Sequence, residues 1–171
     1  MRKIFSTALI ALFLIFSTAT SIEAISQKQA AERTITSSAT TGEIMSRDQA
    51  AEEILRLCNI ERKKAGVPAL KLSRELYKPA MTRAREIVKS FSHTRPNGLS
   101  FSSVFYGINY RTVGENLAAG QTSCEMVVQQ WMDSPGHRAN ILNKKFKFLG
   151  VAYLYNEKGH YKHYWVQEFK G

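Results

Sequence analysis

A change in the spacing of apolar residues near Asn143 constrains the fold more than any other feature of this sequence. Before it, apolar residues recur at the three- and four-residue spacing of amphipathic helices. After it, residues 148–155 and 161–169 are rich in Val, Tyr, Phe and Trp and are separated by residues 156–159, which is typical of a β-hairpin. Residues 110–118 form a weaker strand candidate. Helices followed by strands predict an α+β fold with an antiparallel sheet covered by helices.

Three segments carry the helical spacing. The first opens at residues 46–49, which have the spacing of a capping box, and it should end at Ala65. The second should start near Ser73 and bury a stripe of Leu, Ala, Ile, Val and Phe side chains, and Pro79 should kink it or mark a late start. The third follows another capping-box pattern at residues 122–125 and must stop near Pro135, because proline interrupts a helix. These helices supply the layers that should cover the sheet.

The N-terminal segment, residues 1–24, has the three parts of a secretory leader. Arg2 and Lys3 give a basic start, residues 4–16 are apolar, and residues 17–24 are small and polar. An uncleaved membrane anchor is the alternative, but the apolar run falls short of the roughly 20 residues that span a bilayer. We therefore expect a secreted, extracellular protein with no transmembrane segment after removal of the leader.

The rest of the chain divides into a linker and one domain. Residues 25–45 are rich in Ser, Thr, Ala and Gln and have no sustained apolar period, which predicts a disordered linker. Residues 46–171 fit one domain by length and can bury a proper core. We therefore place all of the chemistry of the chain in this C-terminal domain.

The basic charge of the chain limits the classes of partner. A formal net charge of +10 favours contact with anionic surfaces outside the cell, such as lipid headgroups or acidic wall polymers. The alternative is simply a soluble, well-charged surface. A secretory leader and the lack of an arginine-rich arm or recognition motif argue against nucleic acid as a partner.

The two cysteines, Cys58 and Cys124, leave two alternatives open. Export makes a disulfide feasible, and two cysteines allow a single intramolecular pairing. Both residues also sit on predicted apolar helix faces, so two buried free thiols are an equally good interpretation. A nucleophilic thiol is disfavoured, because nothing near either cysteine in the sequence suggests an activating base.

Four motif segments follow one another in an order that resembles a known family. They comprise Ser-His-Thr-Arg-Pro-Asn-Gly at residues 92–98, Val-Gly-Glu-Asn-Leu-Ala at 113–118, the run from Trp131 to Leu142, and residues 149–153 with 164–169. Together they resemble the CAP superfamily of cysteine-rich secretory, antigen five and pathogenesis-related proteins, in its bacterial extracellular SCP-like branch. The resemblance implies an α-β-α sandwich with a central antiparallel sheet flanked by helices.

The resemblance also implies a cavity lined by two histidines and two acidic residues. By motif position, His93 and His137 match the two histidines, and Glu115 matches the first acid. The second acid is expected a few residues after the helix tryptophan, where this chain has Asp133 followed by Ser134. The set of four is therefore incomplete, and whether Asp133 or Ser134 replaces the second acid is open.

These cavity residues suggest three kinds of chemistry. Two imidazoles and a carboxylate suffice to hold a divalent cation such as zinc, with His93 and His137 as metal ligands. Without a metal, the two histidines and Glu115 could carry out acid–base catalysis. The third interpretation is a hydrogen-bonded cluster that locks the helices to the sheet. Asn116 and Ser134 neighbour these residues in the sequence and complete the candidate cavity, although each could instead bond to the backbone.

Fold alone does not fix function, so three functions follow from this cavity. The leading hypothesis is a secreted binding module that holds a divalent cation in the cavity and a peptide, lipid or glycan in an adjoining groove. The second is a metal-assisted extracellular hydrolase that acts on peptides or wall material. The third is a structural or partner-binding protein whose polar cavity only stabilises the fold.

Overall fold

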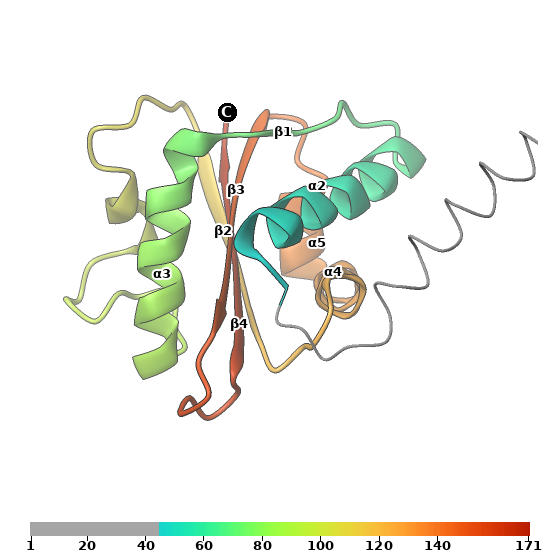
Figure 1. Ribbon diagram of the computed structural model, residues 1–171. Helices are drawn as coiled ribbons and strands as arrows, with labels where there is room; N and C mark the ends of the chain where they lie inside the picture. The colour runs from blue at the N-terminus through green and yellow to red at the C-terminus, as the bar shows by residue number, and fades with distance from the viewer. Residues whose placement is uncertain (1–44) are drawn as a thin grey trace, which may run out of the picture. The chain divides into compact units, whose positions relative to one another are not determined.

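The computed structural model describes residues 45–171, and the predicted leader and nearly all of the predicted linker lie outside this part of the chain. Two layers of helix enclose one sheet (Figure 1). The helices are α2 (Arg47–Lys64), α3 (Tyr77–Lys89), α4 (Cys124–Asp133) and α5 (Pro135–Ile141), with 3-10 turns η1 (Arg74–Leu76) and η2 (Phe101–Phe105). The strands are β1 (Lys71–Leu72), β2 (Val113–Ala119), β3 (Phe148–Tyr155) and β4 (His163–Lys170).

The sheet has the order β1-β3-β4-β2, so that β2 lies at one edge. β3 and β4 form the predicted hairpin, and β2 pairs antiparallel with β4. Only β1 runs parallel to its neighbour, β3, over two residues. The predicted α+β class is confirmed, and the sheet is mixed because of β1, which is too short to show an alternating pattern in the sequence.

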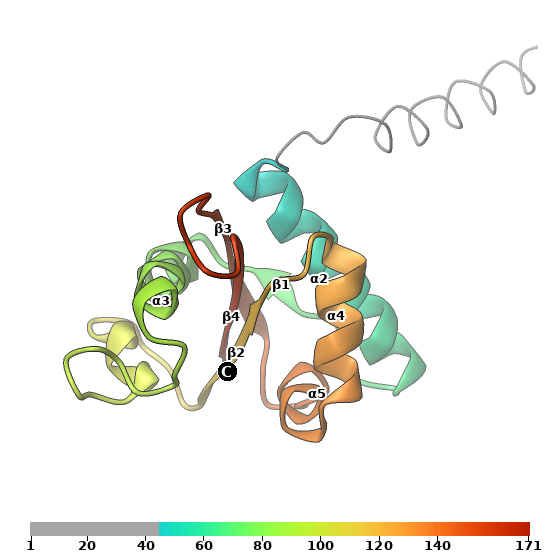
Figure 2. The same cartoon turned by 90° about the horizontal axis from the view of Figure 1, so that it is seen from below.

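The two faces of the sheet carry different helices (Figure 2). On one face, α3 packs Ala80, Ala84 and Ile87 against Leu117 and Val166. On the other face, α2 and α4 bury a larger core, with these members: Ala50, Ile54, Cys58, Val127, Val128, Trp131, Trp165 and Phe169. The expected α-β-α sandwich is therefore present, with β2 at the edge that both helical layers approach.

Local sequence explains where α2 begins and ends. Ser46 accepts from the Gln49 amide, and the Gln49 side chain accepts from the Ser46 amide, so the predicted capping box is confirmed. Ala65 caps the C-terminus as expected, and Gly66 follows with a φ of 66°. The buried positions recur every four residues, which directs one face of the helix to the sheet: Ala50, Ile54, Cys58 and Arg62.

The other two predicted helices differ from expectation in ways that proline and capping chemistry explain. The second was expected near Ser73, with a late start at Pro79 as an alternative; a 3-10 turn comes first and α3 starts at Tyr77, two residues before that proline. The capping box expected at 122–125 is wrong by one residue, because Ser123 is the N-cap and accepts from the Met126 amide. Pro135 ends α4 as predicted and also opens α5 at its first position, where a missing N–H costs nothing.

Buried Arg62 of α2 forms hydrogen bonds to the end of α5 and to the loop that follows it. Its guanidinium donates to the carbonyl oxygens of Ile141 (2.6 Å), Asn143 (3.1 Å), Phe146 (3.2 Å) and Pro68 (2.7 Å). The C-terminus of a helix leaves carbonyl groups without intrahelical partners, and Arg62 satisfies that of Ile141 at the end of α5 and those of Asn143 and Phe146 in the loop that follows. This contact holds the short helix in place against the rest of the domain.

The two cysteines are free, buried thiols, which decides between the alternatives left open by the sequence. Cys58 Sγ accepts from Gln167 Nε2 at 3.1 Å, whereas Cys124 lies beside Met45 and the carbonyl oxygen of Ala50. Burial raises the pKa of each thiol to about 12. Thiols with such a pKa are protonated and unreactive at neutral pH.

Candidate functional site

Strand β2 divides the predicted site between the two faces of the sheet. Successive side chains of a strand point to opposite faces, so Glu115 faces α3 whereas Asn116 faces α5. Asn116 is fully buried and donates to the His137 carbonyl oxygen (3.1 Å) and to Gln167 Oε1 (3.0 Å). Its own side-chain oxygen accepts from Asn140 Nδ2 (2.9 Å). The Asn116 amide thus joins α5 to β2 and positions the helix that carries His137.

Glu115 is held in a buried ion pair with Arg83 of α3. Its Oε2 accepts from Arg83 Nε at 2.6 Å, and its Oε1 lies 2.7 Å from His93 Nδ1. Arg83 also pairs with Glu86, at 2.6 Å. A buried ion pair of this kind needs further hydrogen bonds to offset desolvation, and Glu86 and His93 provide them. Sequence reasoning missed Arg83, although its position one turn after the buried Ala80 was a usable signal.

A second buried acid lies beside Glu115, and it is Glu168. The two residues are direct partners in the β2–β4 register, and Glu168 is fully buried. Neither of its carboxyl oxygens has a hydrogen-bond partner among residues 45–171. Burial, and next the charge of Glu115, raise the pKa of Glu168 well above its ordinary value. The raised pKa favours the protonated form of Glu168, whose O–H can donate to the facing carboxylate.

From the sequence, the second acid was expected at Asp133 or replaced by Ser134, at the end of α4. Asp133 is exposed at the end of that helix and accepts from Gln129 Nε2 at 3.0 Å. Ser134 follows it as the C-cap of α4 and lines a pocket with His137. The carboxyl group that adjoins Glu115 comes from β4, and only strand pairing brings it there.

The two histidines lie close together but have different surroundings. The His93 side chain is 56% exposed and is oriented by Glu115. His137 projects from α5, and its Nδ1 is buried with no hydrogen-bond partner in the described part of the chain. Burial, and then the nearby charge of His93, lower the pKa of His137. His137 is therefore neutral at neutral pH, which leaves its ring available for hydrogen bonding.

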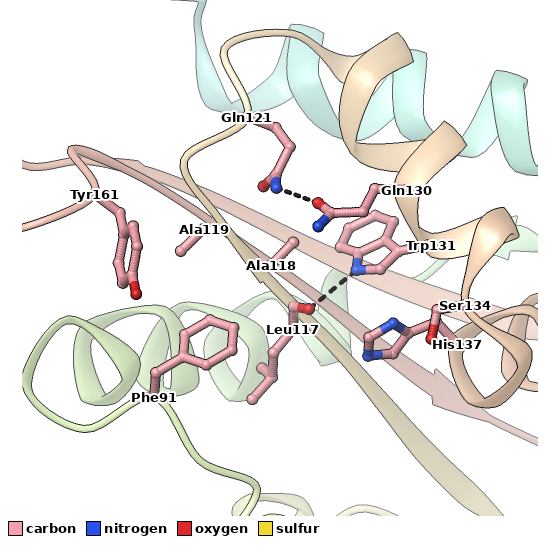
Figure 3. Close-up of a pocket in the computed structure, with 10 residues that line it drawn as sticks. All are labelled: Phe91, Leu117, Ala118, Ala119, Gln121, Gln130, Trp131, Ser134, His137 and Tyr161. Carbon is pink, nitrogen blue, oxygen red and sulfur yellow. Dashed lines mark hydrogen bonds between the residues drawn. The ribbon is translucent and has the colours of Figure 1, made fainter.

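A pocket of about 330 Å³ follows the outer edge of β2, and we call it the β2 pocket. Figure 3 shows the strand residues 117–119 between Phe91 and Tyr161 on one side and Trp131 and His137 on the other. Aromatic and aliphatic groups make up most of the wall, and four polar side chains interrupt it: Gln121, Gln130, Ser134 and His137. Such a mixture is typical of sites that bind an organic ligand.

The residues present do not form the three-donor metal site expected from the sequence. Within residues 45–171, no three His, Cys, Asp or Glu side chains are placed to hold one ion. Both oxygens of Glu115 are engaged by Arg83 and His93, and His93 Nδ1 is engaged in turn. His93 and His137 leave a set of two donors, which is fewer than structural and catalytic zinc sites use. Binding of a divalent cation by these histidines stays a prediction.

The family follows from the extent of the sequence match. Residues 55–169 match the CAP family, described as the cysteine-rich secretory protein family. This chain belongs to the CAP family. The matched range contains all four motif segments, so the resemblance noted in the sequence is confirmed. As in the CAP structures it resembles, the chain folds as helices packed on both faces of a small sheet.

Two Bacillus proteins are similar to this CAP domain in sequence or in structure. YkwD of Bacillus subtilis (strain 168) is 39% identical over 124 residues, which are 70% of this chain and 46% of YkwD. An extracellular SCP-domain protein of Bacillus anthracis superposes with a TM-score of 0.63 at 26% identity, over 72% of this chain and 41% of that one. This CAP chain thus spans less than half the length of either relative.

One solved structure matches the fold over almost its whole length. An outer surface protein of Borrelia burgdorferi superposes with a TM-score of 0.66 at 20% identity, over 76% of this chain and 98% of that protein. At this identity the likeness concerns the fold alone. In residues 45–171 of the CAP chain, every helix is too short or too polar to cross a membrane.

Proposed function

We propose that this CAP domain is a secreted binding module that holds a peptide segment in the β2 pocket. The observation that carries the proposal is His137, which lines the pocket and whose buried Nδ1 has no partner among residues 45–171. Gln121 Oε1, in the same lining, is also buried and unpartnered. A buried polar atom without a partner costs roughly 1–3 kcal/mol. Because both atoms are buried in the free chain, a ligand recovers this free energy when the two side chains turn to bond to it.

The chemistry of the pocket favours a peptide over the other ligand classes expected from the sequence. A lipid chain would offer no hydrogen bond to His137, to Ser134 or to the amide groups left over from the Gln121–Gln130 contact, which is unfavourable. Three successive strand residues, 117–119, also line the pocket. Their main-chain edge is matched by the amide groups of another polypeptide, which neither a lipid nor a glycan supplies.

Two observations support secretion. The three-part pattern of residues 1–24 is that of a secretory leader. The related proteins of Bacillus anthracis and Borrelia burgdorferi are described as extracellular and outer surface proteins. A binding module outside the cell would meet peptide segments of secreted or surface proteins.

Selection from a phage-displayed library of random heptapeptides tests the proposal. The purified chain is used as bait, selected peptides are synthesised, and their dissociation constants are measured by calorimetry. We expect His137→Ala to weaken binding by about tenfold, because one hydrogen bond and its packing are lost. Mass spectrometry of the peptide after incubation tests the alternative of a hydrolase, which would cleave the peptide rather than return it intact.

Two neighbouring glutamines of α4 provide a matched control. Gln130 lines the β2 pocket, whereas Gln129 lies outside it and bonds to Asp133. Gln130→Ala should weaken peptide binding, and Gln129→Ala should leave it unchanged, although both substitutions remove the same side chain from the same helix. If the library yields no peptide whose binding responds to His137 or Gln130, the β2 pocket is not a peptide site.

A further inference from the structure

The register of the sheet determines which main-chain groups of β2 point outward. The Gly120 amide donates to the His163 carbonyl oxygen at 2.9 Å, at the end of the β2–β4 ladder. Bonding groups alternate along an antiparallel strand, so Ala118 also turns its N–H and C=O toward β4. Leu117 and Ala119, one residue away on either side, turn theirs toward the free edge.

Two outward carbonyl groups of β2 confirm this alternation, since side chains already use them. The Glu115 carbonyl oxygen accepts from Asn140 Nδ2, and the Leu117 carbonyl oxygen accepts from Trp131 Nε1, each at 3.1 Å. Through these contacts, α5 and α4 cover the outward carbonyl groups of Glu115 and Leu117. Beyond the Glu115 carbonyl group, the outward groups left open are therefore the Leu117 amide and the N–H and C=O of Ala119.

The open stretch has main-chain groups without partners. Within residues 45–171, no hydrogen bond reaches the Leu117 amide or the outward N–H and C=O of Ala119. Leu117 is only 4% exposed, and buried main-chain amides without a partner are rare in folded proteins. The β2 pocket lies against these same residues, so a ligand or ordered water in the pocket is what can supply their partners.

We infer that the peptide pairs with Leu117 and Ala119 as an added strand at the free edge of the four-stranded sheet. This inference rests on the proposed function and specifies how the peptide binds. Main-chain bonds to the two residues fix the segment in an extended conformation, and its alternate side chains then point to opposite walls. One wall is formed by Phe91 and Tyr161, and the other by α4 (Figure 3).

A separate peptide segment fits this edge better than a second copy of the chain does. The open stretch is recessed between its two walls, and Leu117 and Ala118 are almost fully buried. A folded copy would bring its own walls against those of the first and could not reach the edge. Covering a strand edge in this way is how folded proteins avoid pairing with each other, whereas a thin, extended segment can enter.

Scanning the tightest selected peptide with single N-methyl groups tests the inference. Each N-methyl group removes one amide donor and blocks close approach of a strand. Strand addition predicts that N-methylation weakens binding by at least about tenfold at alternate residues and has little effect at those between them. A uniform pattern with binding retained would overturn strand addition while leaving the proposed peptide binding intact.

Amide exchange measured by NMR on the full chain gives an independent readout. On binding the peptide, the amides of Leu117 and Ala119 should become protected from exchange with solvent. The Ala118 amide, already in the β2–β4 ladder, should be protected with or without peptide and serves as the internal control. Unchanged exchange at both outward amides in a saturated complex contradicts the inference. Failure of every peptide to bind overturns the proposed function and the inference together.

Discussion

Glu168 is an ionisable residue buried in the core. It lies directly opposite Glu115 on the neighbouring strand of the sheet. Two adjacent carboxyl groups cannot both be charged without strong repulsion. Arg83 is bonded to Glu115 and makes Glu115 the charged member of the pair. Folding therefore favours the protonated form of Glu168.

Replacing Glu168 with Gln should change how stability depends on pH. The folded state raises the pKa of Glu168 above its ordinary value of 4.5, so its contribution to stability is complete below that pH. The contribution declines as pH rises through the folded-state pKa, by about 1.4 kcal/mol for each unit of the shift. Glu168→Gln cannot lose a proton, so it should be more stable than the parent at neutral and alkaline pH.

Urea denaturation at a series of pH values measures this difference. The free energies of unfolding of parent and Glu168→Gln should converge below about pH 4, where the carboxyl is protonated in both folded and unfolded chains. Parallel pH profiles, with a constant gap between the two proteins, would mean that Glu168 does not hold its proton in the folded state.

Removal of metal ions should leave peptide binding unchanged. The β2 pocket offers hydrogen-bonding groups to a peptide, and Glu115, the carboxylate expected to complete a metal site, is engaged by Arg83. Calorimetric titration of a selected peptide in EDTA and in added zinc should give the same dissociation constant. Loss of binding in EDTA, with recovery in zinc, would show that a cation completes the pocket.

The sequence located some site residues and could not locate others, for a physical reason. His93, Glu115 and His137 each lie in a recognisable motif segment, so they were identified without coordinates. Arg83 and Glu168 owe their roles to a helix packed on a sheet and to the register of two strands. Glu168 gave one signal, because it follows Tyr164 and Val166 on one face of a strand. The pattern did not show that it would pair with Glu115.

Among the elements, α5 is the helix that the spacing of apolar residues could not predict. Pro135 was correctly expected to stop a helix, yet the same residue starts α5, which carries His137. A helix of seven residues is too short to show an amphipathic period and too short to be stable alone. Its stability comes from tertiary contacts, chiefly those of Arg62 and Asn116, and these were not visible in the local sequence.

Arg62→Met should destabilise the domain strongly. The substitution keeps an unbranched apolar chain but leaves four carbonyl groups without their donor. Since each buried group left without a partner is unfavourable, we expect a loss of about 3 kcal/mol or more in the free energy of unfolding. Urea denaturation measures the loss.

Arg56 is the matched control on the same helix. Its side chain is 57% exposed and pairs with Glu53 alone. Exposed pairs contribute little, so Arg56→Met should leave the free energy of unfolding nearly unchanged. Equal losses for the two substitutions would contradict the role given to Arg62 in holding α5.

At the scale of the whole molecule, the layered fold was predictable because apolar residues are spaced differently in the helices and in the strands. Helical spacing before Asn143 and the hairpin after it were sufficient to predict helices on an antiparallel sheet. The edge position of β2 was not predictable, because strand order depends on contacts between distant segments. That position matters most for function, since the β2 pocket exists only at an open edge.

The domain should need no disulfide for its stability. Cys58 and Cys124 are both buried in the core between α2, α4 and the sheet as free thiols. The melting temperature should therefore be the same with and without a reducing agent. Alkylation after denaturation, without reduction, should label both residues by mass spectrometry. A mass two hydrogens lower, together with a lower melting temperature in reductant, would instead reveal a bond between them.

The place of Trp131 has a practical consequence. Its indole N–H is bonded to the Leu117 carbonyl oxygen at the inner end of the free edge, whereas Trp165 donates to the Gln121 carbonyl oxygen from within the core. Indole emission depends on the polarity around the ring, so a segment entering this edge would alter the fluorescence of Trp131 first. With Trp165 replaced by Phe, Trp131 would be the source of the tryptophan fluorescence. Binding in the β2 pocket could then be followed in real time without an attached dye.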